Sequence, residues 1–140
     1  MSSLHDFTTA ACPYAEVPER LQTYLDRNDA TIALRLPLGD LRLERDVHVR
    51  LTPKAGYTGY KLLDVSWSPK DGGAYPDFTG TLSIADEGVG WSRIDLDGTY
   101  TPPFGVLGAA FDAAIGHRIA EATASELLAE LQRILTAIRV

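Results

Sequence analysis

Apolar and polar residues alternate along most of the first hundred positions of this chain, which is the pattern of half-buried β-strands. The clearest run is 41–51, where leucines and valines occupy one side and charged residues the other. The same alternation predicts strands over 4–11, 30–38, 60–68, 78–85 and 89–100, with turns at 39–40, 53–59, 69–76 and 86–88. Consecutive strands joined by such short turns predict an antiparallel sheet with one apolar face.

Two segments instead repeat apolar residues every three to four positions, which predicts helices. The first covers 17–28, where Pro18 suits the opening turn. The second runs from about Phe104 to Ile138, directly after the last strand stops at prolines 102 and 103. Glycines at 105, 108 and 116 weaken its first part. We therefore expect a break or bend near Gly116, or a separate first turn over 106–115.

The C-terminal helix carries an apolar stripe that is too long for one neighbouring helix to cover. The stripe comprises Ala120, Ala124, Leu127, Leu128, Leu131, Ile134, Leu135 and Ile138. We therefore expect this helix to lie across a curved sheet, an arrangement that tends to trap an internal cavity.

The most distinctive segment joins the last strand to this helix. It reads Leu96-Asp97-Gly98-Thr99-Tyr100-Thr101-Pro102-Pro103-Phe104-Gly105-Val106-Leu107-Gly108 and continues through Asp112 and Gly116 to Ala120. It resembles the G-x-Y-x-P-P-x-G-x-x-G-x-x-x-D stretch of uncharacterised bacterial members of the START/SRPBCC superfamily, which includes pollen-allergen-like proteins, polyketide cyclases and small lipid-binding proteins. The motif covers about twenty residues, whereas the order of elements resembles the superfamily's helix-grip fold over nearly the whole chain.

The resemblance implies an α+β fold, in which a curved antiparallel β-sheet wraps around a long C-terminal α-helix. It implies one helix-grip domain over residues 1–140, with a cavity between sheet and helix for an apolar or aromatic ligand. The sequence departs from the full fold in having fewer long strands, so one strand is expected to be short or misassigned.

Composition narrows the choice of partners. The chain has 140 residues and a formal charge of −6, which argues against nucleic acid and against anionic lipid headgroups. No stretch approaches the ~20 apolar residues of a membrane span, and the N-terminus lacks a signal-peptide pattern. The single cysteine, Cys12, is expected to be a small buried residue, with a reactive thiol as the alternative. We expect a cytoplasmic protein without membrane insertion.

No motif for a cofactor or a metal is present. The sequence has no phosphate-binding glycine loop and no nucleophile elbow, and its histidines at 5, 48 and 117 are far apart. We therefore predict neither cofactor nor metal. His117 falls within the covered stripe of the helix. It is either a core histidine bonded to a carbonyl or carboxylate, or a polar group lining the cavity that binds a ligand or moves a proton.

Arg45 interrupts the apolar side of its strand. A buried guanidinium cannot stay unpaired, so Arg45 must pair with a carboxylate, reach an edge or face a wet cavity where it could anchor a ligand. Lys61 has the same alternatives, with its stem along the apolar face and its amine in water favoured.

Aromatic residues are expected mainly in the core, with some lining the cavity. Tyr100 is the best placed of these because it lies at a strand end beside the Pro-Pro turn, and Trp67 is expected to point inward. Gly80 and Gly98 occupy inward positions, which indicates either a bent or bulged strand or an opening for ligand. Trp91 faces outward, and a contact between two copies of the chain in a homodimer is one role open to it.

The leading hypothesis is a binding module for a small hydrophobic ligand, lipid-like or aromatic, with Arg45, Trp67, Tyr100 and His117 as ligand-binding residues. One alternative is an enzyme of the polyketide cyclase or dehydratase kind, in which His117 or Arg45 shuttles protons, although the sequence shows no convincing acid–base pair. The other is a protein-interaction domain with a filled core, which would use Trp91 and the apolar segment 104–107.

Overall fold

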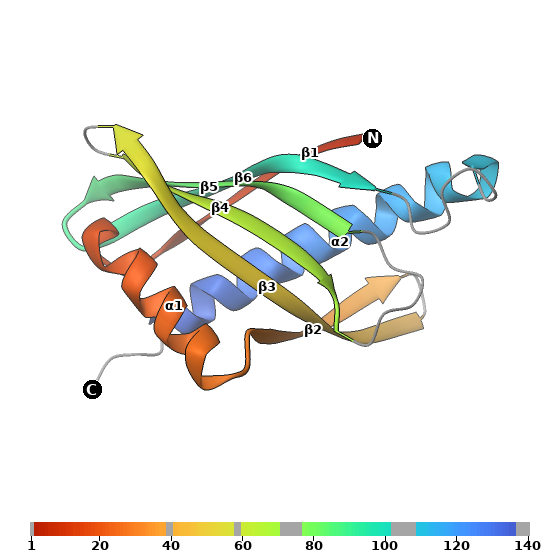
Figure 1. Cartoon of the computed structure of the whole chain (residues 1–140), viewed down its shortest axis with the longest axis horizontal. Coiled ribbons are helices and arrows are strands. Elements are labelled where there is room, and N and C mark those ends of the chain that lie inside the picture. The colour runs from red at the N-terminus through yellow and green to blue at the C-terminus, as the bar shows by residue number, and fades with distance from the viewer. Residues whose placement is uncertain (1, 39–40, 58–59, 71–76, 102–108, 137–140) are drawn as a thin grey trace.

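The computed structural model describes residues 2–38, 41–57, 60–70, 77–101 and 109–136 (Figure 1). Its strands are β1 (Ser2–Ala10), β2 (Thr31–Leu38), β3 (Leu41–Tyr57), β4 (Tyr60–Pro69), β5 (Asp77–Gly88) and β6 (Trp91–Thr101). Its helices are a 3₁₀ turn η1 (Tyr14–Glu16), α1 (Val17–Arg27) and α2 (Ala109–Thr136). Each of the six predicted strands and both predicted helices is therefore present.

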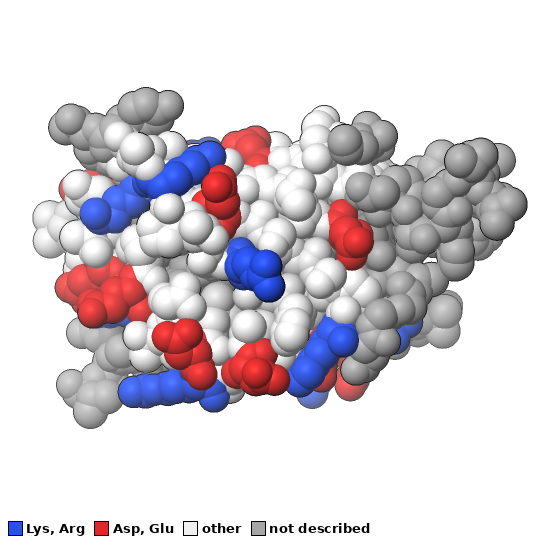
Figure 2. Space-filling model, viewed as in Figure 1, with Lys and Arg blue, Asp and Glu red and all other residues white. Residues whose placement is uncertain are grey.

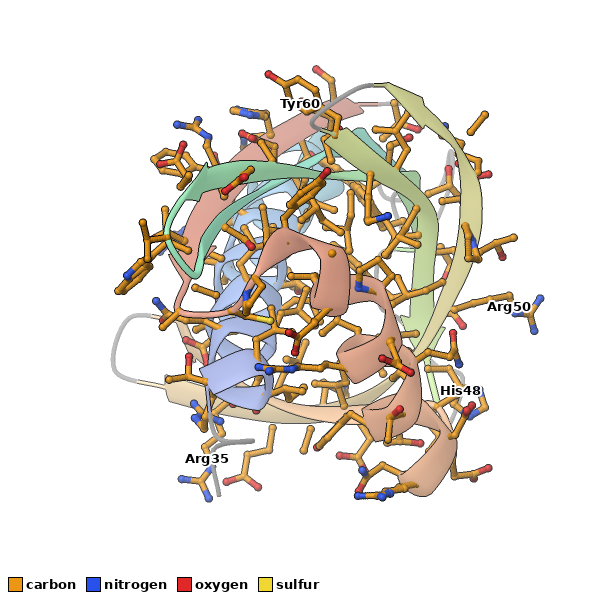
Figure 3. All side chains as sticks on the ribbon, turned by 90° about the vertical axis from the view of Figure 1, so that its left-hand side faces the viewer. Arg35, His48, Arg50 and Tyr60 are labelled. Carbon is orange, nitrogen blue, oxygen red and sulfur yellow. The ribbon has the colours of Figure 1, made fainter. Side chains whose placement is uncertain are left out.

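All six strands join one antiparallel sheet in the order β1-β6-β5-β4-β3-β2. The first strand pairs with the last, so β1 and β2 form the two edges. Helix α2 packs chiefly against these two edges, which requires the sheet to curl around the helix. Figure 3 shows this wrapping end-on, with α1 across the nearer end of the curled sheet. The predicted α+β helix-grip fold is confirmed.

The core lies between the concave face of the sheet and the stripe of α2. On the sheet side it holds the inward residues of the alternating strands, such as Ile32, Val49, Val65, Leu82, Ile94 and Leu96. On the helix side it holds the predicted stripe, of which Ala120, Ala124, Leu127, Leu128, Leu131, Ile134 and Leu135 are buried. Burying a leucine of this kind stabilises the fold by about 2 kcal/mol, so α2 is essential to it.

The opposite face of the sheet meets solvent. The polar residues of β3 from Glu44 to Arg50 that alternate with valines 47 and 49 are exposed, as predicted. In the view of Figure 2, charges of both signs are scattered over this face and form no continuous basic patch among the described residues.

Two of the predicted turns are part of strands in the structure. The segment 53–59 was expected to be a turn, but β3 continues to Tyr57, and Pro53 pairs in register with Leu63 of β4. A register shift between Lys54 and Tyr57 marks an irregularity at the end of this strand, where a proline and a glycine are tolerated. The predicted turn at 86–88 is likewise part of β5. The turn falls at 89–90 instead, where Gly88 before it and Gly90 within it have positive φ.

Helix α2 begins at Ala109 and is continuous through Gly116, so the predicted break there is wrong. A single glycine weakens a helix by only about 1 kcal/mol relative to alanine, which the packing of the following stripe can offset. The segment 102–108, where the helix was expected to begin, lies outside the described residues, as does the predicted turn at 39–40.

Gly80 and Gly98 are register partners on neighbouring strands β5 and β6. No register shift occurs between them, which excludes the predicted bulge at this pair. The room they leave is taken by the ring of Phe78, since a Cβ atom built on Gly98 would lie 2.5 Å from Phe78 Cζ and one on Gly80 would lie 2.8 Å from it. An opening for ligand at this pair is excluded for the same reason.

Candidate functional site

A row of aromatic side chains crosses the concave face of the sheet near one end. Trp67 of β4 is the register partner of Phe78 of β5, which is the register partner of Tyr100 of β6. All three are buried, with 2% of Trp67 and 3% of Tyr100 exposed. The Trp67 and Phe78 rings are stacked, with centroids 4.2 Å apart and planes 10° from parallel. Alternation along three strands thus places three aromatic residues in register on one face of the sheet.

The indole N–H of Trp67 has no hydrogen-bond partner within the described part of the chain, although it is buried. A buried donor without an acceptor costs about 1–3 kcal/mol, and most buried polar groups in folded proteins are paired. An unpaired donor on a concave apolar face is therefore an unusual feature that calls for an explanation.

His117 of α2 meets the other end of the aromatic row. Its Nδ1 atom lies 2.7 Å from the hydroxyl oxygen of Tyr100, and the two rings are 5.8 Å apart. Its Nε2 atom lies 3.2 Å from a carboxylate oxygen of Glu121, one turn further along the helix. Because a carboxylate only accepts, it favours the tautomer with the proton on Nε2, so Nδ1 accepts the hydrogen bond that the Tyr100 hydroxyl donates.

The surroundings of His117 agree in part with the core histidine described from the sequence, whereas a ligand-binding role stays a prediction. The ring is half-buried and bonded to the Tyr100 hydroxyl, with a carboxylate beside it, rather than to a backbone carbonyl. Glu121 was not singled out from the sequence. The spacing of four residues between His117 and Glu121 is the signal that could have identified it.

Arg45 lies apart from these residues. It sits opposite the buried Leu34 on the concave side of the sheet, yet it is exposed. It lines an open groove of about 500 Å³ between the β2–β3 hairpin and α2, together with Glu126 and Glu130. Of the alternatives drawn from the sequence, Arg45 thus reaches an edge. No ion pair of Arg45 is present within the described residues.

The side chain of Lys61 runs from the inner face of the sheet towards one end of the core. It pairs with the buried Ile84, so its stem starts on the inner face, and its amine lies 5.8 Å from the centre of the Tyr14 ring. That placement stabilises the charge at one end of the core. Cys12 is buried, as expected for its structural role.

The outer face of β1 and β6 holds a second cluster, which is exposed. His5 Nε2 lies 3.4 Å from Asp95, and Arg93 donates to the same carboxylate and covers the ring of Phe7 at 4.0 Å. The hydrogen bond to Asp95 raises the pKa of Arg93 above its ordinary value, so this guanidinium stays charged. Trp91 is 49% exposed on the same face, as predicted.

The predicted ligand-binding residues therefore fall into two places. Tyr100 and His117 are in contact, Trp67 lies in the same row two strands away, and Arg45 belongs to a separate groove. Phe78, which lies between Trp67 and Tyr100 in the register, was among the aromatic residues expected mainly in the core. The apolar segment 104–107 and the prolines at 102 and 103 lie outside the described residues.

The described residues contain neither a cluster of metal ligands nor a membrane-spanning helix. Nowhere in these ranges do three or more His, Cys, Asp or Glu side chains gather as a metal site would require. Among the same residues, neither helix combines the length and the apolar character needed to cross a bilayer.

Comparison with known proteins places the fold. No protein-family model matches the sequence, and no curated protein matches it significantly. Among solved structures, the human StarD13 (DLC2) lipid transfer and protein localization domain matches with a TM-score of 0.58 and 11% identity, over 97% of this chain and 78% of that one.

Norcoclaurine synthase from Thalictrum flavum gives a second match. Its truncated form has a TM-score of 0.50 and 10% identity, over 99% of this chain and 95% of that one. Its complex with dopamine and hydroxybenzaldehyde has a TM-score of 0.50 and 8% identity, over 99% of this chain and 88% of that one. At these identities the likeness concerns the fold, which is of the START/SRPBCC type.

Proposed function

We propose that this START/SRPBCC-type fold binds a small hydrophobic molecule, lipid-like or aromatic, between the concave face of its sheet and α2. The observation that carries the proposal is the buried indole N–H of Trp67, which lacks an acceptor in the described residues and belongs to an aromatic row. A ligand with a hydrogen-bond acceptor would satisfy that donor while its apolar part meets Phe78. A small-molecule site is usually lined by many apolar groups and a few polar ones.

The matched structures support the same class of function. One is a lipid transfer domain, and the other holds two small aromatic molecules in one of its complexes. In this chain, Tyr100 and His117 would supply polar contacts at the second end of the row. Arg45 is the remaining candidate, as an anchor for an acidic group of a ligand that extends into the groove beside α2.

Native mass spectrometry of freshly purified protein, followed by titration with the neutral apolar dye N-phenylnaphthylamine, tests this function. We expect either a bound mass or saturable dye binding with a 1:1 ratio. Trp67→Phe removes the indole donor and should weaken a ligand that carries an acceptor by roughly fivefold, the worth of one hydrogen bond. Trp91→Phe is the matched control, since Trp91 lies on the outer face. Absence of both bound mass and dye binding would contradict the proposal.

Arg45 has its own test in the same titration. If it anchors an acidic group, Arg45→Ala weakens binding of a fatty acid but not of the neutral dye. Arg50→Ala is the control, because Arg50 is exposed on β3, lies outside this groove and points away from the interior (Figure 3). If the fatty acid binds both variants and the unaltered chain with equal affinity, Arg45 does not bind the acidic group of a ligand.

An enzyme of the cyclase or dehydratase kind is the second candidate. The observation that favours it is the contact between His117, Tyr100 and Glu121, which supplies the acid–base pair that the sequence lacked.

The expectations of a cytoplasmic location, of a homodimer and of no nucleic-acid partner stay predictions.

A further inference from the structure

Three polar side chains lead from solvent to the buried aromatic row. Glu121 is 60% exposed, His117 is 43% exposed, and Tyr100 is buried at the end of the series. We propose that they form a proton relay that takes the proton of a weakly acidic hydroxyl group, so that the ligand is a phenol or an enol. This inference rests on the proposed function, because it needs a ligand against the concave face.

The hydroxyl oxygen of Tyr100 can accept one more hydrogen bond. It donates its own proton to Nδ1 of His117, and this is its one hydrogen bond in the described ranges. A phenolic oxygen can also accept, so Tyr100 retains acceptor capacity on a side chain that is almost wholly buried. A hydroxyl group of a bound ligand is the natural donor to that oxygen.

His117 and Glu121 supply the rest of the relay. A neutral imidazole can accept a proton at Nδ1, and a carboxylate beside the other ring nitrogen orients the ring and stabilises the imidazolium that forms. The carboxylate of Glu121 holds this position at 3.2 Å from Nε2. Arg118, the next residue along the helix, is exposed.

The step moves two protons and needs no co-reactant. The ligand O–H bond breaks as its proton passes to the Tyr100 oxygen, while the original Tyr100 proton passes to Nδ1 of His117. The products are a ligand oxyanion, a neutral Tyr100 that now donates to it, and an imidazolium beside the Glu121 carboxylate. The total charge is unchanged.

The aromatic row also indicates the shape of the ligand. Trp67 and Tyr100 flank Phe78 on the two neighbouring strands, two strand spacings or about 10 Å apart. A ligand of one aromatic ring with an oxygen at each end could accept from the Trp67 N–H and donate to Tyr100. A hydroxyaryl ketone has this arrangement, because its carbonyl accepts and its hydroxyl is acidic.

The test uses para-hydroxyacetophenone, whose phenol and phenolate forms differ in absorbance, and acetophenone, which lacks the hydroxyl. At a fixed pH about one unit below the midpoint of ionisation of the free phenol, we expect the phenolate form to be enriched on binding to the full chain. Tyr100→Phe and His117→Gln should abolish this enrichment. Glu121→Gln should lower it roughly two- to fivefold, the size of an exposed ion pair. Acetophenone should bind all variants equally.

Two variants on the outside of the molecule serve as controls. His48→Gln and Tyr60→Phe make the same chemical changes on side chains that point away from the interior (Figure 3), and they should leave the enrichment intact. Glu121→Gln keeps the test decisive if Tyr100→Phe fails to fold, because Glu121 lies on the exposed side of α2.

The outcomes separate the relay from the binding site. If both ketones bind and the phenolate fraction is the same in all chains, the relay is overturned and the proposed function stands. If neither ketone binds while the apolar dye does, the assigned ligand class is wrong. If nothing binds, the proposed function fails and the relay fails with it.

Discussion

Two consecutive non-glycine residues adopt left-handed backbone conformations in the turn between α1 and β2. Asp29 has a φ of 56° and Ala30 a φ of 54°. The turn is held by hydrogen bonds, since the Ala30 N–H donates to the Leu25 carbonyl and the Ala30 carbonyl accepts from Val49. An alanine in this region costs about 1–2 kcal/mol, which the surrounding contacts must offset.

Ala30→Gly should therefore stabilise the chain. Glycine adopts this conformation without strain, and its greater freedom in the unfolded chain subtracts part of the gain, so we expect the free energy of unfolding to rise by about 0.5 kcal/mol. Urea denaturation followed by circular dichroism measures it. Ala129→Gly inside α2 is the matched control and should lose about 1 kcal/mol. A loss of equal size in both variants would contradict the argument from backbone strain.

The ligand-binding residues were predicted one at a time from their positions in the sequence. Tyr100 and His117 were chosen separately, one for its strand end and one for its place on the helix stripe, and they are in contact. Arg45 was chosen because it breaks the alternation, and the structure places it in another groove. A side chain's face is readable from sequence, whereas its neighbour across the fold is not.

At the scale of elements, the sheet depends on a close approach between β5 and β6. Gly80 and Gly98 pair directly, and the ring of Phe78 lies over them. An aromatic side chain over paired glycines fills space that two side chains would otherwise occupy and fixes the local register.

Gly98→Ala should disrupt this packing. Its new Cβ would meet Phe78 Cζ at 2.5 Å and would also press on backbone, which cannot move away as a flexible side chain does. We expect a loss of about 3 kcal/mol in the free energy of unfolding, measured by chemical denaturation. Gly90→Ala is the control, since its φ of 79° is strained but its Cβ would meet open space, and it should lose only about 1 kcal/mol. A larger loss in Gly90→Ala than in Gly98→Ala would show that the ring of Phe78 does not require a glycine at position 98.

The two helices are tied together by one partly buried arginine. Arg20 of α1 donates from Nη1 to the carbonyl of Leu135 in the last turn of α2 at 3.0 Å, and it also pairs with Glu16. Such a bond satisfies a carbonyl that the end of a helix leaves without a partner and complements the helix dipole.

Arg20→Ala should loosen the end of α2. A hydrogen bond from a charged donor to a partly buried carbonyl contributes about 1.5–3 kcal/mol, and we expect a loss near the lower value because part of the side chain is exposed. Hydrogen exchange should show faster exchange in the last turns of α2. Arg27→Ala, at an exposed position of the same helix, should change neither quantity. Unaltered exchange in Arg20→Ala would show that the contact adds nothing.

At the scale of the whole molecule, α2 lies against both edge strands and closes the curled sheet. Gln132 adds a hydrogen bond to the Thr9 carbonyl of β1 on one side, and Arg20 ties α2 to α1 on the other. A ligand held between helix and sheet would contact elements from every part of the chain, so binding and global stability should be coupled.

Ligand binding should therefore raise the thermal midpoint. At a free dye concentration one hundred times its Kd, linkage predicts about 2.7 kcal/mol of stabilisation, or a rise of roughly 10 °C for a chain of this size. Differential scanning calorimetry with N-phenylnaphthylamine measures it. The rise should persist in Trp91→Phe. A midpoint independent of dye concentration would show that the dye does not bind the folded chain in preference to the unfolded chain.

The sequence by itself determined which side of each element is buried. Alternation assigned the inward residues of β3 to β6, and the helical period assigned the stripe of α2, because the polarity of a side chain reports directly on its access to water. The fold class followed from the order of these elements. Their ends were less well determined, as Pro53 within β3 and Gly116 within α2 show.

Only the tertiary structure decided which buried residues meet. Strand register brings Trp67, Phe78 and Tyr100 into one row, and the position of α2 over the sheet brings His117 to Tyr100. The same geometry separates Arg45 from them. Periodicity fixes the face on which a residue lies but is silent on how far neighbouring strands are offset, since that offset is set by the pairing and packing of the whole sheet.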